Sequence, residues 1–188
     1  MLSHILLAGD LDPTISVGGI LKAIGGNIRV GDSGLFVTEA CEYTNSFLHF
    51  LPKISIILNI DADHLDFFKD LDDIRSSFRR FAQLLPSDGA LIINGNIPDL
   101  EGFTEGLPCR VISYGMDSSF DYAAVNLSYG TDGAVSFDFI KEGIFVDRIS
   151  LSVNGEHNVQ NALASLAVAD LLHLSLIHIS EPTRHAQI

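Results

Sequence analysis

Three short polar clusters contain side chains that could bind a metal ion or a nucleotide. The first is DADHLD, in which Asp61, Asp63, His64 and Asp66 directly follow the apolar run ISIILNI. Carboxylate oxygens and an imidazole nitrogen can together bind a divalent cation. The alternative is a solvent-exposed turn, because aspartate commonly forms turns and caps helices. The spacing of these residues leaves both interpretations open.

The second cluster is VTEACEYTNSF, which contains Glu39 and Glu42. Glu39 ends a predicted strand, as the acidic cluster around His64 does. If the two strands are neighbours, Glu39 and His64 converge on one crevice at the carboxyl edge of a sheet, where open α/β sheets bind ligands. Glu42 is interpreted as a solvent-exposed residue of the following short helix.

The third cluster is GEHNVQNALAS, in which His157, Asn158 and Asn161 lie at a predicted helix start. Free backbone N–H groups and the helix dipole favour ligands there. Asn158 and Asn161 are three residues apart and share one face of the helix, and amide side chains can bind the donor and acceptor edge of a purine. The alternative is that Asn158 is the N-cap of the helix and Asn161 packs against a loop.

An alternation of strands and helices must position these clusters. Apolar and β-branched runs predict strands over 14–21, 34–40, 53–60, 89–94 and 109–115, and helices are predicted over 44–51, 71–86 and 98–106. Thr44 or Asn45 is the expected N-cap of the first helix. Strands separated by helices favour parallel pairing with right-handed crossovers.

The pattern changes at about residue 121. Alternating strands joined by GTDG and KEG predict an antiparallel meander over about 121–154, and a helix rich in Ala and Leu follows over 155–172. The last segment, 174–188, breaks the helical pattern and resembles a translated adapter sequence. We expect it to be non-native, so His178 and His185 are not considered as site residues.

Bulk properties exclude several classes of protein. The formal net charge of −13 argues against a nucleic-acid partner. No apolar run approaches the roughly 18 residues of a membrane span. The two cysteines, Cys41 and Cys109, form neither a disulfide framework nor a zinc signature, which favours reduced thiols in the cytoplasm. The sequence contains no G-x-x-x-x-G-K-[ST] phosphate loop and no G-x-S-x-G elbow.

The three clusters together resemble a known family. LDPTISVGG, EACEYTNSFLHFLPKISIILNIDADHLDFF and GEHNVQNALASLAVA, in this order and spacing, are similar to the central, ATP-binding domain of the Mur ligases. The resemblance covers residues 8–173 and is strongest to members that add L-alanine to UDP-N-acetylmuramate. It implies a three-layer α/β domain over 1–173, with a mostly parallel sheet (about 1–120), the meander, and an ATP-contacting helix (about 155–173).

The resemblance also implies a reaction and its participants. The family forms an amide bond with ATP: a substrate carboxylate takes the γ-phosphoryl group, and an amino group attacks the resulting acyl phosphate. It implies Mg²⁺ held by Glu39 and His64, ATP contacted by His157, Asn158 and Asn161, and UDP-N-acetylmuramate and L-alanine as substrates of the complete cytoplasmic enzyme in peptidoglycan precursor synthesis. No nucleic acid or membrane partner is implied.

Departures from the family pattern limit this expectation. Some relatives have a carbamylated lysine on the helix after the histidine, but the helix over 71–86 offers only Arg75, Arg79 and Arg80, so no catalytic residue is assigned. The first strand and the phosphate loop expected upstream of LDPT are missing. We therefore expect a fragment of a ligase that is inactive alone. The alternatives are another ligase of the superfamily, such as a folylpolyglutamate synthetase or a different Mur ligase, and a non-catalytic α/β module that binds Mg-nucleotide.

Overall fold

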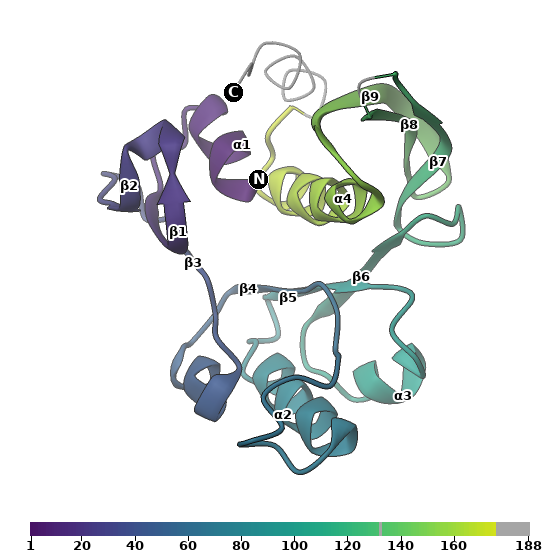
Figure 1. Ribbon diagram of the computed structural model, residues 1–188. Coiled ribbons are helices and arrows are strands. Elements are labelled where there is room, and N and C mark those ends of the chain that lie inside the picture. Colours follow the sequence, from purple (N-terminus) through teal and green to yellow (C-terminus); the bar gives the residue numbers. More distant parts are fainter. Residues whose placement is uncertain (132, 176–188) are drawn as a thin grey trace.

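A computed structural model describes residues 1–131 and 133–175 of the chain (Figure 1). The helices are α1 (Leu2–Ala8), α2 (Leu71–Gln83), α3 (Leu100–Thr104) and α4 (Glu156–Leu171), with 3₁₀ segments η1 (Lys22–Ile24) and η2 (Tyr43–His49). The strands are β1 (Thr14–Leu21), β2 (Gly26–Arg29), β3 (Phe36–Thr38), β4 (Ile54–Ile57), β5 (Ala90–Asn94), β6 (Arg110–Gly115), β7 (Tyr122–Tyr129), β8 (Ala134–Lys141) and β9 (Ile144–Asn154).

The main sheet has six strands in the order β4-β5-β6-β7-β8-β9. Neighbouring strands from β4 to β7 are parallel, and the pairs β7–β8 and β8–β9 are antiparallel. The prediction of a mostly parallel α/β sheet with a small antiparallel meander is therefore confirmed. Strand β5 (ALIIN) is buried along its whole length, as expected for a central parallel strand covered on both faces.

Helices cover both faces of the parallel part of this sheet (Figure 1). On one face α4 packs against β5, β6 and β7, and α1 packs against α4. On the other face side chains from α2 and α3 form a second core with alternate residues of β5, so Ile92 belongs to the first core, and Leu91 and Ile93 to the second. The α4 helix is buried from Val159 to Ala169 almost without interruption, because it lies between the sheet and α1.

A partly buried polar trio joins the end of α4 to the meander. Asp170 accepts hydrogen bonds from the hydroxyl of Tyr122 at 2.5 Å and from Nζ of Lys141 at 2.8 Å. Burial disfavours the charged carboxylate, but these two bonds and the charge of Lys141 outweigh it and hold the pKa of Asp170 below its usual value.

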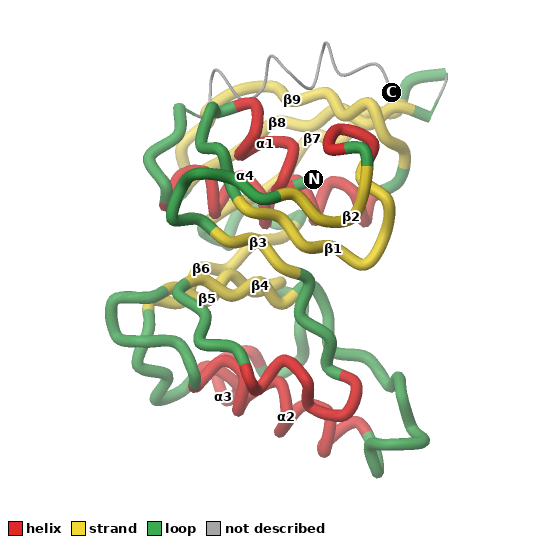
Figure 2. The backbone as a smooth tube through the Cα atoms, turned by 90° about the vertical axis from the view of Figure 1, so that its left-hand side faces the viewer, coloured by secondary structure: helices red, strands yellow, loops and turns green. Residues whose placement is uncertain are grey.

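A separate small sheet has the order β2-β1-β3 and lies beside α1 in both views (Figures 1 and 2). Strand β1 pairs antiparallel with β2 and parallel with β3. The expectation that the strands ending near Glu39 and before His64 are neighbours is therefore wrong: β3 lies in the small sheet and β4 is an edge strand of the large one. The unpredicted return strand β2, which follows the left-handed Gly25 (φ 67°), gives β1 a hairpin partner, and β3 takes the other edge of β1.

Other boundaries also differ from the predictions. The predicted helix over 44–51 is the 3₁₀ segment η2, which begins after Glu42 and contains Thr44 and Asn45 in left-handed conformations, so neither residue is its N-cap. The strand predicted over 53–60 is limited to β4, and helix α2 ends at Gln83 instead of residue 86. Helix α1 was not predicted, because seven residues are too few for a clear helical period.

Of the segment predicted to be non-native, the structure describes Leu174 and Ser175, whereas His178 and His185 lie outside the described residues. Leu174 packs against the core and lies close to Gly9. Among the described residues, no helix combines the length and apolar character needed to cross a bilayer.

Candidate cation and nucleotide site

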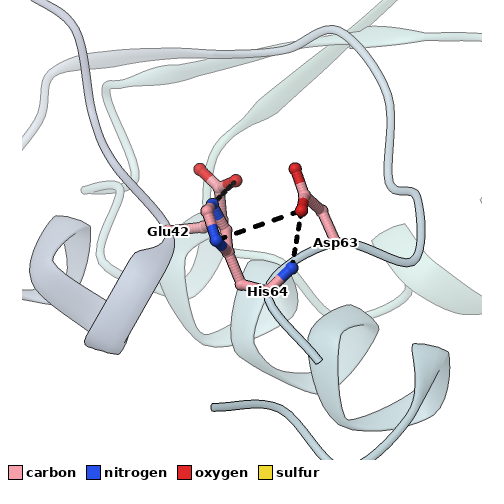
Figure 3. Close-up of side chains that lie close together, drawn as sticks. All are labelled: Glu42, Asp63 and His64. Atoms are coloured by element: carbon pink, nitrogen blue, oxygen red, sulfur yellow. Dashed lines mark hydrogen bonds and ion pairs between the residues drawn. The ribbon is translucent and has the colours of Figure 1, made fainter. Parts of the chain in front are cut away.

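Glu42, Asp63 and His64 form what we call the histidine–carboxylate cluster (Figure 3). Asp63 and His64 lie in the loop after β4, and Glu42 immediately precedes η2. Nε2 of His64 is 3.5 Å from Oε1 of Glu42, and Nδ1 of His64 is 3.9 Å from Oδ1 of Asp63. One potential ligand atom from each residue lies within 4.8 Å of the others. Two carboxylates and an imidazole so arranged are a donor set suited to a divalent cation.

The backbone is left-handed at three positions, one in this cluster and two beside it. His64 has φ 52°, and Thr44 and Asn45, which follow Glu42, have φ 55° and 59°. Residues other than glycine seldom adopt this left-handed region, and such conformations are enriched at functional sites. Contacts with α2 hold the strained segment, since Oδ1 of Asn45 accepts hydrogen bonds from the buried hydroxyl of Ser77 and from Nη2 of Arg80.

Tyr43 connects the two loops of the cluster. Its ring centroid lies 4.7 Å from that of His64, and its hydroxyl donates to Oδ2 of Asp66 at 2.9 Å. The negative charge of Asp66 stabilises the protonated phenol, so the hydrogen bond raises the pKa of Tyr43. Asp61 accepts a hydrogen bond from Nδ2 of Asn59 at 2.6 Å. Asp61 and Asp66 therefore shape the loop, and of the aspartates in DADHLD, Asp63 is the one within the cluster.

A small pocket of about 90 Å³ lies beside the cluster. Polar side chains of Glu42, Asn59, Asp61 and Asp63 line it, together with Ile74 and Phe78 from α2. The pocket therefore has an apolar side formed by the helix and an acidic side formed by the loops, and the acidic side favours a cation over an anion.

Glu39 is not a member of the cluster. Its Oε2 accepts a hydrogen bond from the backbone nitrogen of Gly18 at 2.8 Å, so the carboxylate holds β1 to the segment after β3. A Cβ atom at Gly18 would lie 2.9 Å from the same oxygen, so a larger residue there would have to displace the Glu39 carboxylate. Glu42, interpreted from the sequence as solvent-exposed, is instead the glutamate that contacts His64.

The arginines of α2 have structural partners. Arg75 donates to the backbone oxygen of Asp99 at 2.6 Å, and Arg79 donates to that of Glu105 at 2.6 Å. Arg80 donates to Asn45, as described above. These cations thus fasten α2 to α3 and to η2, and none of them belongs to the histidine–carboxylate cluster.

His157, Asn158 and Asn161 form a second group, which we call the asparagine cluster, at the start of α4. Nδ2 of Asn158 donates to the backbone oxygen of Asn154 at 2.8 Å and lies 3.1 Å from Nε2 of His157. Nδ2 of Asn161 is 3.4 Å from Oδ1 of Asn158. The N-cap is Gly155 (φ 98°), which has no capping side chain, so Asn158 is not the helix cap.

Both clusters lie at the carboxyl edge of the parallel strands. Asn94, the last residue of β5, contacts Leu58 just beyond β4 and also Gln160 in the first turns of α4. This is the edge at which open α/β sheets bind ligands. The fold therefore presents an acidic, histidine-containing group and an amide-rich helix start at the same edge of the sheet.

Comparison with known proteins identifies the family. Residues 26–169 match the family profile described as the Mur ligase middle domain. The chain belongs to the Mur ligase family. The family predicted from the three motifs is thus confirmed.

Similar Mur ligases are longer than this chain. The UDP-N-acetylmuramate–L-alanine ligase of Agathobacter rectalis is 54% identical over 174 residues, which are 93% of this chain and 38% of the relative. The corresponding ligase of Lachnoclostridium phytofermentans is 52% identical over 182 residues, covering 92% of this chain and 39% of the relative. The chain thus spans less than two fifths of the length of these relatives.

Crystal structures of Mur ligases share the fold. The UDP-N-acetylmuramate–alanine ligase of Thermotoga maritima superposes with a TM-score of 0.81 at 26% identity, covering 97% of this chain and 40% of that one. A UDP-N-acetylmuramate:L-alanyl-γ-D-glutamyl-meso-diaminopimelate ligase from Neisseria meningitides superposes with a TM-score of 0.84, also at 26% identity, covering 97% of this chain and 60% of that one. These likenesses span both the parallel part and the meander of this Mur ligase domain.

Proposed function

We propose that this chain is the Mg-ATP-binding part of a cytoplasmic ligase that joins L-alanine to UDP-N-acetylmuramate in peptidoglycan precursor synthesis. The observation that carries the proposal is the position of the histidine–carboxylate cluster and the asparagine cluster at one edge of the parallel sheet. The substrates are inferred from relatives that are 54% and 52% identical to this chain and are named as L-alanine-adding ligases.

The donor atoms of the histidine–carboxylate cluster lie close enough together for a magnesium ion to draw them in. Nε2 of His64 and Oε1 of Glu42 are 3.5 Å apart. Adjacent ligands of an octahedral Mg²⁺ are about 3.0 Å apart, so binding would require a small inward shift of these side chains. Glu39, beyond this cluster, is the further ligand proposed from the family resemblance, and its carboxylate retains a second oxygen besides the one bonded to Gly18. When bound, the ion would offset negative charge on the ATP phosphates.

The asparagine cluster supplies the complementary recognition. The amides of Asn158 and Asn161 carry the donor and acceptor groups that pair with a purine edge, and His157 adds an aromatic ring nitrogen. A bound purine would compete with the present hydrogen bonds of Asn158 to Asn154 and Asn161. The first backbone N–H groups of a helix and the positive end of its dipole favour negative charge, and this applies to the start of α4. In the proposed enzyme these residues hold and orient ATP while the substrate carboxylate takes the γ-phosphoryl group, and the amino group of alanine then displaces phosphate from the acyl phosphate. For the 188-residue chain alone we expect ligand binding without turnover.

A chimeric enzyme tests this proposal. Residues 1–173 replace the aligned segment of the Agathobacter rectalis ligase, and phosphate release is measured with UDP-N-acetylmuramate, ATP and a panel of amino acids. We expect release that depends on L-alanine and that falls at least about 100-fold in His64→Ala, within the range for loss of a group that stabilises transition-state charge. A His49→Ala chimera is the matched control, since His49 is exposed in the neighbouring η2 segment.

Two results would contradict the proposal. A folded chimera that prefers another amino acid would assign the chain to a different ligase of the superfamily. A His64→Ala chimera as active as the His49→Ala control would remove the histidine–carboxylate cluster from the reaction and leave a domain without a demonstrated catalytic contribution.

A further inference from the structure

Asn94 links the two clusters through a single buried side chain. Its Nδ2 atom is 3.0 Å from the backbone oxygen of Leu58 and 3.0 Å from Oε1 of Gln160. Leu58 directly follows β4 and begins the loop that leads to His64, and Gln160 lies between Asn158 and Asn161 in α4. Asn94 is 7% exposed, so the donor of both hydrogen bonds is buried.

The partners of Asn94 determine the orientation of its amide. Both N–H groups of Nδ2 have acceptors, and Oδ1 accepts a hydrogen bond from the backbone nitrogen of Asn96 at 3.0 Å. A flipped amide would place its oxygen against two acceptors, so these hydrogen-bond partners determine which amide atom is nitrogen. A second buried side chain also bonds to the end of β4: the hydroxyl of Tyr114 donates to the backbone oxygen of Ile57 at 3.3 Å.

The Asn94 amide fixes the spacing of two acceptors that also have access to water. Leu58 is 44% exposed and Gln160 is partly buried, so both acceptors can bind water when the amide is removed, and their spacing is then no longer set by one shared donor. Loss of the bridge is therefore expected to move or loosen the β4 exit relative to α4. It leaves the residues of each cluster, and their contacts within the cluster, in place.

We propose that Asn94 is a positioning residue that sets the distance between the histidine–carboxylate cluster and the asparagine cluster. This inference rests on the proposed function, since only a ligand that contacts both clusters at once depends on their separation. A metal ion alone contacts the first cluster and adenosine alone contacts the second. Mn-ATP contacts both, and its second contact is strengthened by the effective concentration that the fixed spacing provides.

Isothermal titration calorimetry on the 188-residue chain tests this idea with Mn²⁺, adenosine and Mn-ATP as separate probes. Asn94→Leu and Gln160→Leu are expected to weaken Mn-ATP binding about tenfold, because the second contact loses its fixed spacing. The affinities for Mn²⁺ and for adenosine should each change by less than about twofold, since neither probe spans the bridge. Gln160→Glu should keep the affinity for Mn-ATP, because a carboxylate still accepts the hydrogen bond from Asn94.

The matched control is Ile92→Val, which removes one buried methylene from the same strand without touching the bridge. Equal weakening of all three probes in Asn94→Leu, or an unchanged affinity for Mn-ATP, would overturn the positioning role and leave the proposed function intact. If Asn94→Leu does not fold, the comparison of Gln160→Leu with Gln160→Glu replaces it: weaker Mn-ATP binding in the first alone supports the positioning role, and equal affinities would overturn it. A wild-type chain that binds Mn-ATP no more tightly than Mn²⁺ or adenosine would overturn the two-cluster site, and the role of Asn94 with it.

Discussion

Replacement of Tyr43 separates two ways in which it supports His64. Tyr43→Leu removes the ring that lies 4.7 Å from the imidazole as well as the hydroxyl bonded to Asp66 at 2.9 Å, whereas Tyr43→Phe removes only the hydroxyl. A ring pair of this kind contributes about 0.5–1.5 kcal/mol. If that energy holds His64 in its cation-binding orientation, its loss corresponds to about a 2- to 12-fold weaker affinity for Mn²⁺.

The measurement is the Kd of Mn²⁺ by electron paramagnetic resonance of the free ion, with both variants at the same pH and salt. Tyr43→Phe should stay within about twofold of wild type, because the hydrogen bond between Tyr43 and Asp66 is exposed and water can replace it. Equal affinities for wild type and Tyr43→Leu would show that the ring contact does not position His64. Equal losses in the two variants would assign the effect to the hydroxyl and Asp66 instead.

Three further predictions concern the scaffold. Asp170 has a lowered pKa in the folded chain, so its carboxylate stabilises the fold above its unfolded pKa of about 3.9 and loses this effect as pH falls through the folded pKa. Asp170→Asn should lower the free energy of unfolding by about 1–3 kcal/mol at pH 7, measured by urea unfolding. The difference in free energy between variant and wild type should vanish at acid pH, and a difference independent of pH would contradict the assignment. Phe47 is 1% exposed, and its ring stacks on that of Phe81 with 4.6 Å between the ring centroids. Phe47→Ala should therefore lower the free energy of unfolding by about 3–5 kcal/mol, and a loss below about 1 kcal/mol would refute this packing. Gly155→Ala should destabilise the start of α4, because φ is 98° and a Cβ would lie 2.6 Å from Cε1 of His157; amide exchange at residues 156–161 should accelerate, and unchanged exchange would argue against the strain.

The parts of the fold with a strong local signal were predictable from the sequence. Buried apolar runs of strand length gave β5 and β6, and the alternating runs with their turn residues gave the meander. The long Ala- and Leu-rich segment gave α4, with the asparagine cluster at its start. In each case the pattern within one element is sufficient, because burial on one or two faces decides which residues can be apolar.

The parts that depend on contacts between distant segments were not predictable. Glu42 reaches His64 because η2 is bent by left-handed residues, and the bend is held by contacts of Asn45 with Ser77, which is 32 positions away in the chain. No local pattern reports such a contact. The small sheet is a similar case, since the pairing of β1 with β2 depends on a short hairpin whose strand β2 has only four residues, GNIR. The metal-binding role of Glu39 and His64 and the ATP-binding role of the asparagine cluster stay predictions.

The central claim is that one Mg-nucleotide contacts both clusters, and paramagnetic broadening by Mn-ATP tests it most directly. In ¹⁵N-labelled chain, substoichiometric Mn-ATP should broaden amide signals of the loop around His64, of the segment around Glu42 and of the first turn of α4, and excess Mg-ATP should reverse the effect. Because the chain carries a net charge of −13, diffuse binding at other acidic residues such as Asp72 or Glu101 is the competing outcome. Broadening spread over those surface residues, without a maximum at His64, would contradict the account.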